Sequence, residues 1–197
     1  MAKKFAGMEV PDGLSTINFT FMFVCTLFAG MLMVIPTILQ PPFMKDIIMV
    51  DQQYAGSVNS FLQNLSQIST LVLVAYVCSL SDRKGRKILA FIGFIICAVF
   101  YYLFGQSGNI AAALNISPGF SSKFCAFLSI VPGKSAEFTQ FAPALFVAYV
   151  NRLILGIGLV FIYPQFITMV ADYTYEKDRG KGMGFNGFMM GLGSLLV

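Results

Sequence analysis

A short charged segment between two long apolar runs constrains this chain more than any other feature. Residues 81–87 read Ser-Asp-Arg-Lys-Gly-Arg-Lys, with one carboxylate, four cations and a glycine. Soluble domains rarely have this layout, which is typical of two membrane-spanning helices joined by a tight turn. Asp82 can cap the turn, and Gly85 can adopt the backbone angles that a chain reversal requires. The segment therefore predicts a helical hairpin in a bilayer, with its cations near the lipid headgroups.

The overall composition agrees with a membrane protein and narrows the chemistry. Hydrophobic residues make up 57% of the chain, charged residues make up 11%, and histidine is absent. The net charge of +4 comes from cations in turns beside apolar runs, so it predicts membrane orientation and no nucleic-acid partner. Without histidine, neither a Ser-His-Asp triad nor a histidine-rich metal site can form. We therefore expect no enzyme activity, no cofactor and no metal.

Four segments are long enough to cross a bilayer, which takes about 20 residues of helix, and a fifth begins before the chain ends. The predicted spans are 16–39, 55–80, 88–104, 143–170 and the incomplete 182–197. Pro41-Pro42 should stop the first helix. The predicted fold class is an all-α polytopic membrane bundle. Because the fifth span stops at Val197 with no polar segment after it, we expect this chain to be the N-terminal portion of a longer polypeptide.

The charges of the connecting segments predict the orientation. Nine cations fall on one side, namely Lys3, Lys4, Arg83, Lys84, Arg86, Lys87, Lys177, Arg179 and Lys181. Three fall on the other, namely Lys45, Lys123 and Lys134. This bias places residues 1–15 and the 81–87 turn in the cytoplasm and makes 105–140 an external loop, in an inner or plasma membrane. Within that loop, 124–131 is too short to span, so we expect an external excursion or an interfacial helix, with Cys125 open to thiol reagents from outside.

The charged turn also carries a family resemblance. Residues 78–87 read Cys-Ser-Leu-Ser-Asp-Arg-Lys-Gly-Arg-Lys. This resembles the G-x-L-a-D-R-x-G-R-R/K signature between the second and third helices of the major facilitator superfamily. Leu80, Asp82, Arg83, Gly85, Arg86 and Lys87 match it in order and spacing, and Cys78 replaces the first glycine.

Two further stretches resemble the same family, in the expected order. Arg152, Gly156 and Gly158 match its R-x-x-x-G-x-G pattern in the fourth span, and 171–180 resembles its acidic-then-Arg-Gly turn between the fourth and fifth helices. The resemblance covers essentially the whole chain and the first half of the usual twelve helices. It implies a secondary transporter that moves a small-molecule substrate by alternating access, with the C-terminal half of the same polypeptide as its partner.

For the charged turn, the residues leave two interpretations open. Asp82 is either a helix cap in a solvated turn or a latch that grips charged groups when the inside is closed, with Asp172 and Arg179 on the same face as partners. The resemblance implies that Asp82 meets a helix of the second half and that Asp172 pairs with an arginine of the 83–86 segment. The predicted gating set is Asp82, Arg83, Gly85, Arg86, Lys87, Asp172 and Arg179.

Arg152 is the only ionisable residue well inside a span. A charge there costs at least ~2.5–3.5 kcal/mol on insertion scales, so Arg152 either serves a function or snorkels to the outer interface. Tyr149, Arg152, Gly156 and Tyr163 share one helical face, which we interpret as a cavity wall. The arginine favours an anionic or zwitterionic substrate, or a role in proton coupling as the resemblance suggests.

The second span carries a polar stripe of Ser60, Gln63, Gln67 and Thr70 at three- and four-residue steps. It either makes hydrogen bonds between helices or lines a substrate path, and Gln63 and Gln67 join Arg152 and Tyr149 as candidate substrate or coupling residues. The glycines at 180, 182, 184, 187, 191 and 193 predict tight packing of the fifth helix.

A membrane sensor or regulator that keeps a transporter scaffold without transport is the alternative function. Seven more spans in the rest of the reading frame would favour the transporter, whereas a soluble signalling domain would favour the sensor.

Overall fold

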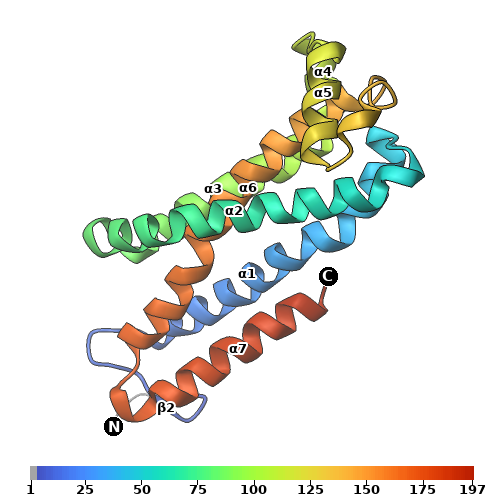
Figure 1. The fold of residues 1–197 in the computed structure, drawn as a ribbon. Helices are drawn as coiled ribbons and strands as arrows, with labels where there is room; N and C mark the ends of the chain where they lie inside the picture. The colour runs from blue at the N-terminus through green and yellow to red at the C-terminus, as the bar shows by residue number, and fades with distance from the viewer. Residues whose placement is uncertain (1–3) are drawn as a thin grey trace.

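Long helices form almost the whole structure. The computed structural model describes residues 4–197, so Lys3 of the predicted 1–15 segment lies outside the described residues. Within 4–197 there are seven α-helices (Figure 1), which confirms the all-α fold class. The strands and helices are β1 (Lys4–Phe5), β2 (Met8–Glu9), α1 (Thr16–Phe43), α2 (Gln52–Lys84), α3 (Arg86–Gly105), α4 (Ser107–Ala113), α5 (Pro118–Leu128), α6 (Ala142–Tyr173) and α7 (Arg179–Leu195), with a π-helical turn at Met44–Ile48 and 3-10 turns at Pro132–Lys134 and Glu176–Asp178.

Four of these helices are long and apolar enough to cross a membrane. They are Thr16–Ile48, Gln52–Lys84, Arg86–Gly105 and Ala142–Tyr173. Side-chain caps mark the starts of the first two. Ser15 Oγ accepts a hydrogen bond from the Asn18 N–H at 3.1 Å, and Asp51 Oδ1 accepts one from the Gln53 N–H at 3.1 Å. The starts of α1 and α2 therefore follow from local capping, and the long bodies follow from the apolar runs.

The first helix does not stop at Pro41-Pro42, so that prediction is wrong. Both prolines lie inside α1, and the chain continues as a π-helical turn to Ile48. The backbone hydrogen bonds resume directly after the two prolines, which lack N–H donors, so the helix continues past them. Met44 N–H bonds the carbonyls of Gln40 and Pro41, and the turn ends at Met49 with a φ of 59°.

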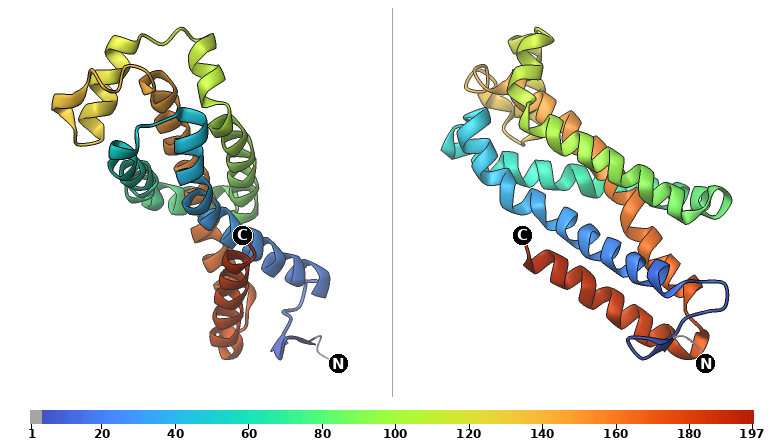
Figure 2. Two further views of the ribbon diagram at one scale, coloured as in Figure 1. Left: turned by 90° about the vertical axis from the view of Figure 1, so that its right-hand side faces the viewer. Right: turned by 180° about the vertical axis from the view of Figure 1, so that it is seen from behind.

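Helix α6 lies at the centre of the bundle, against α2 on one side and α3 on the other, whereas α7 packs along α1 (Figures 1 and 2). Glycines allow both close approaches. A Cβ on Gly156 would lie 2.9 Å from Ser66 Cα of α2, and a Cβ on Gly193 would lie 2.0 Å from the Leu27 carbonyl oxygen of α1. The tight packing predicted for the fifth helix is confirmed at Gly193.

The other predicted glycines of α7 divide into two groups. A Cβ on Gly182 would lie 2.8 Å from the Thr174 side chain, so this glycine is also packed. The remaining four face open space, because a Cβ added to any of them would meet no atom within 4 Å: Gly180, Gly184, Gly187 and Gly191. The packing prediction therefore holds for Gly193, which faces α1, and for Gly182, which faces the end of α6, whereas the other four make no such contact within residues 4–197.

The connection 105–140 contains two short helices, α4 and α5, which each pack on α6 at the end of the bundle remote from the 81–87 turn (Figure 1). Its predicted helix 124–131 starts earlier, as α5. Cys125 is fully buried, with its sulfur 3.7 Å from the Ala142 carbonyl oxygen, so the expectation of an open thiol is wrong. The reason is that one face of α5 packs directly on α6. We call the two ends of the bundle the 81–87 end and the 105–140 end.

Candidate functional site

The turn between α2 and α3 depends on Gly85. Its φ of 94° is in the region that favours glycine, and its N–H bonds the Ser81 carbonyl at 2.9 Å, which closes α2. The backbone reversal predicted for Gly85 is therefore present. Asp82 does not cap either helix, because its carboxylate is directed to a side chain of α3.

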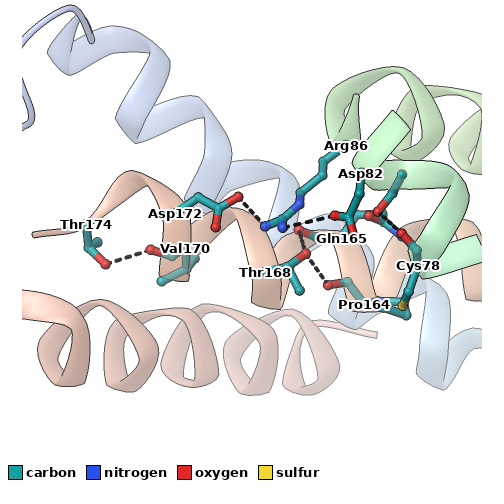
Figure 3. A network of polar contacts seen from close by, with 10 residues as sticks. Cys78, Asp82, Arg86, Pro164, Gln165, Thr168, Val170, Asp172 and Thr174 are labelled. Atoms are coloured by element: carbon teal, nitrogen blue, oxygen red, sulfur yellow. Dashed lines mark hydrogen bonds and ion pairs between the residues drawn. The ribbon is translucent and has the colours of Figure 1, made fainter. Parts of the chain in front are cut away.

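That side chain is Arg86, whose guanidinium lies between two carboxylates (Figure 3). Its Nη2 lies 3.3 Å from Asp82 Oδ1 of α2, and its Nη1 forms an ion pair with Asp172 Oδ2 of α6. The arginine side chain is 22% exposed, whereas that of Asp82 is 67% exposed. One planar cation thus joins three helices, which a lysine could not do with the same geometry. The pairing of Asp172 with an arginine of the turn is present, and the arginine is Arg86.

The other cations of the predicted gating set do not join this cluster. Arg83 is exposed and Lys87 Nζ lies 5.4 Å above the Tyr173 ring, a cation–π distance. Arg179 is exposed at the start of α7 and forms no ion pair within residues 4–197. The structure therefore brings together three of the seven predicted residues, namely Asp82, Arg86 and Asp172, and Gly85 shapes the adjacent turn.

A second polar cluster at the 81–87 end was not found from the sequence. The N-terminal hairpin of β1 and β2 is fastened to the turn between α6 and α7, and we call this contact the N-terminal clasp. Glu9 N–H donates to Asp178 Oδ2 at 3.0 Å, Lys181 Nζ lies 2.9 Å from Asp178 Oδ1, and Lys177 Nζ lies 2.6 Å from Glu9 Oε2. The Glu9 N–H and then Lys181 lower the pKa of Asp178, because both stabilise its ionised form.

Arg152 lies inside the bundle, 4% exposed, and its Nε donates to the Leu62 carbonyl of α2 at 3.2 Å. This burial argues against snorkelling. The predicted cavity wall is only partly present, because Tyr149 packs in a core with its hydroxyl 2.5 Å from Ser129 Oγ, and Gly156 is pressed against α2. Tyr163, the fourth residue of that face, is exposed.

A cavity of about 130 Å³ does lie beside Arg152, between α1, α3 and α6. Its walls are mostly apolar, and Gln40 adds one amide to them. The lining residues are Ile35, Pro36, Leu39, Gln40, Phe43, Tyr101, Phe104, Gly105, Arg152 and Leu155. Arg152 is therefore the charged group of a largely apolar space.

The polar stripe of α2 does not face this cavity. Gln63 is half-buried and Gln67 is exposed, like Ser60. On α2 it is Ser69, outside this stripe, whose hydroxyl bonds another helix, with its Oγ donating to the Leu153 carbonyl of α6 at 3.0 Å. The structure thus assigns helix contact to the neighbouring serine, and Gln63 and Gln67 remain candidates for a substrate path on the outer face.

Sequence reasoning missed several buried amides inside the spans. Gln40 Nε2 lies 2.5 Å from Asn59 Oδ1, Asn151 Nδ2 donates to the Leu103 carbonyl at 3.1 Å, and Gln165 is fully buried. Amide side chains inside apolar runs are a usable signal, because each requires a partner in the bilayer. This signal did not identify Gln40, because Gln40 lies one residue beyond the predicted first span, 16–39.

Comparison with known proteins agrees with the residue-level resemblance. The sequence profile of the Major Facilitator Superfamily matches residues 22–197. Magnetosome protein MamH of Paramagnetospirillum magneticum is 28% identical over 159 residues, which cover 81% of this chain and 31% of that protein. Multidrug resistance protein 2 of Bacillus subtilis is 24% identical over 173 residues, which cover 85% of this chain and 33% of that protein.

A second Bacillus subtilis relative, multidrug resistance protein 1, is 25% identical over 192 residues, which cover 94% of this chain and 38% of that protein. No solved structure gives a significant match. The chain thus spans roughly a third of the length of these relatives, from 31% to 38%.

Proposed function

Since the chain belongs to the Major Facilitator Superfamily, a family of membrane transporters, we propose that it is part of a secondary active transporter that moves a small solute by alternating access. The observation that carries this proposal is the pairing of Arg86 with Asp82 and Asp172. It ties three helix ends together at one face of the bundle while most of the Asp82 carboxylate stays exposed. An exposed carboxylate beside a fixed cation can bind a further helix end and release it, as a gate requires.

The partner of that gate is the second half of the same polypeptide in this proposal. The two halves would rock about a solute site near the bilayer midplane. The charge bias of the connecting segments supports an inner or plasma membrane with the 81–87 end in the cytoplasm and the 105–140 end outside.

The cargo class is open to direct measurement. The Bacillus subtilis relatives are named for multidrug resistance. The buried Arg152 favours an anionic or zwitterionic solute. A panel of labelled solutes containing a lipophilic cation, an amino acid and a dicarboxylate distinguishes these classes.

The test is tracer flux into proteoliposomes of the full-length protein, with and without a proton gradient. We expect gradient-dependent flux of one class, reduced at least about tenfold by Asp82→Asn, because the charged contacts of the carboxylate are lost while the turn keeps its shape. Asp12→Asn is the matched control, since Asp12 is an exposed carboxylate near the turn between α6 and α7 that forms no ion pair with Arg86. Equal flux in Asp82→Asn and wild type would refute the gate, and no flux of any solute would favour the sensor.

A further inference from the structure

The charge of Arg152 lacks a counter-ion in the described part of the chain. Among residues 4–197, no aspartate or glutamate lies within ion-pair distance of it, and its hydrogen bond there uses only Nε, toward a backbone carbonyl. A buried, hydrogen-bonded cation without a negative partner is costly, because the low-polarity surroundings do not compensate its charge. The terminal nitrogens of the guanidinium, which carry four N–H donors, remain for an acceptor.

The cavity beside Arg152 offers space for such an acceptor. It measures about 130 Å³, and its other walls are mainly aliphatic and aromatic. Leu39, which lines the cavity on the α1 side, is 57% exposed, so this wall residue also reaches the surface of the bundle. A small ion of a few heavy atoms fits this space, and a large solute does not.

Gln40 adds a requirement for the guest. The side chain is 1% exposed, and its Nε2 is held by Asn59, at 2.5 Å from Oδ1 and 3.0 Å from the backbone oxygen. Both partner atoms are acceptors, so the Gln40 NH₂ group must point toward Asn59. This orientation leaves Gln40 Oε1 without a partner. That oxygen is buried and has no donor in the structure. A buried carbonyl oxygen without a donor is unfavourable, so the guest must also donate a hydrogen bond.

We infer that this cavity binds a small monovalent oxyanion that carries a hydroxyl group. The anionic oxygens accept from the terminal N–H groups of Arg152, and the hydroxyl donates to Gln40 Oε1. The proposal deepens the proposed function by naming a ligand class for Arg152, yet binding is measured without transport. Water alone would satisfy Gln40 but would leave the charge of Arg152 uncompensated.

Bicarbonate and nitrate test this inference, because both are planar monovalent oxyanions and only bicarbonate can donate a hydrogen bond. The thermal unfolding of the full-length protein in detergent is followed at pH 8 while each sodium salt is titrated at constant ionic strength. We expect saturable stabilisation by both ions, with an apparent Kd for bicarbonate roughly fivefold lower, as one added hydrogen bond predicts.

Two variants separate the roles. Gln40→Leu should keep the nitrate response and lose the preference for bicarbonate, whereas Arg152→Gln should lose saturable stabilisation by either ion. Gln165→Leu is the matched control, because Gln165 is also a buried, unpartnered amide but does not line the cavity. It should keep the preference.

Equal responses to the two ions, or a bicarbonate preference that survives Gln40→Leu, would overturn the inference and leave the cavity to water. If Arg152→Gln does not fold, the inference is still tested by whether Gln40→Leu loses the preference for bicarbonate that wild type and Gln165→Leu show. If the full-length protein shows no flux but still prefers bicarbonate, the proposed function is refuted and the anion site is supported.

Discussion

Arg86 and Arg152 show how the same residue type serves two purposes within one bundle. Arg86 is partly exposed and neutralised by Asp82 and Asp172, so its cost of burial is small. Arg152 is buried among helices and bonded to a backbone carbonyl. The first is suited to a contact that forms and breaks at a surface, and the second to holding a ligand or a proton-coupled partner in the interior.

At Arg152 we expect the planar guanidinium to matter as well as the charge. Lysine keeps the charge but loses the forked donors, so Arg152→Lys should reduce transport by the full-length protein at least about tenfold, and Arg152→Leu should abolish it. Tracer flux normalised to inserted protein measures both. Wild-type flux in the leucine variant would leave Arg152 with no functional role, and full activity of the lysine variant would show that charge alone suffices.

At Arg86 the expected defect has a different origin. Arg86→Lys cannot bridge Asp82 and Asp172 with one planar group, so the three helix ends should separate more often and transport should fall several-fold. Arg83→Lys is the control, since Arg83 is exposed and outside the cluster. Equal flux in the two variants would show that position 86 needs only a positive charge.

At the scale of elements, the contact between α1 and α7 depends on a backbone approach that no side chain permits. Gly193→Ala places a methyl group where the Leu27 carbonyl already lies, so we expect a loss of about 1–3 kcal/mol in stability, as for other overpacked sites. Gly191→Ala in the same helix is the control, because nothing lies within 4 Å of its added methyl. Thermal unfolding in detergent compares them, and similar melting temperatures would contradict the close contact.

The N-terminal clasp is a second element-scale feature, and its pH dependence has a definite sign. The pKa of Asp178 is lowered in the folded protein, so its contribution is complete above the ordinary aspartate range and is lost as the pH falls through the lowered value. Hydrogen exchange of the Glu9 amide reports it directly. We expect protection near neutral pH, and faster exchange in Asp178→Asn than in the control Asp12→Asn. Unchanged exchange in Asp178→Asn would rule out the clasp in solution.

For the whole molecule, topology is the property to measure next. The charge bias predicts that the 81–87 end faces the cytoplasm, but the native Cys125 cannot report the outside because it is buried. Ser81 is also buried, so it is a poor labelling position. Exposed positions are better, and Ala112 of α4 and Lys84 at the end of α2 meet this need.

On intact cells, an impermeant thiol reagent should label Ala112→Cys more strongly than the protein without the added cysteine. It should leave Lys84→Cys unlabelled until the membrane is made permeable. The reverse pattern would invert the orientation and remove the cytoplasmic gate from the proposed mechanism.

The membrane class, the four spans and the family were predictable from the sequence, because each rests on local signals: apolar length, cations in turns, and short motifs such as 81–87. The sequence also placed Gly85 at the reversal and Asp172 on the same face as the turn. These properties need no knowledge of which helices touch.

The pairings between helices were not predictable from the sequence and required the folded structure. It selected Arg86 over Arg83 as the partner of Asp172, replaced Gln63 and Gln67 by Ser69 at the helix contact, and buried Cys125. It also set Gln40 beside Arg152, although 112 positions separate them in the chain. Such contacts depend on how each helix is rotated about its axis, and that rotation is fixed by packing across the whole bundle, through close approaches such as Gly156 on α2 and Gly193 on α1.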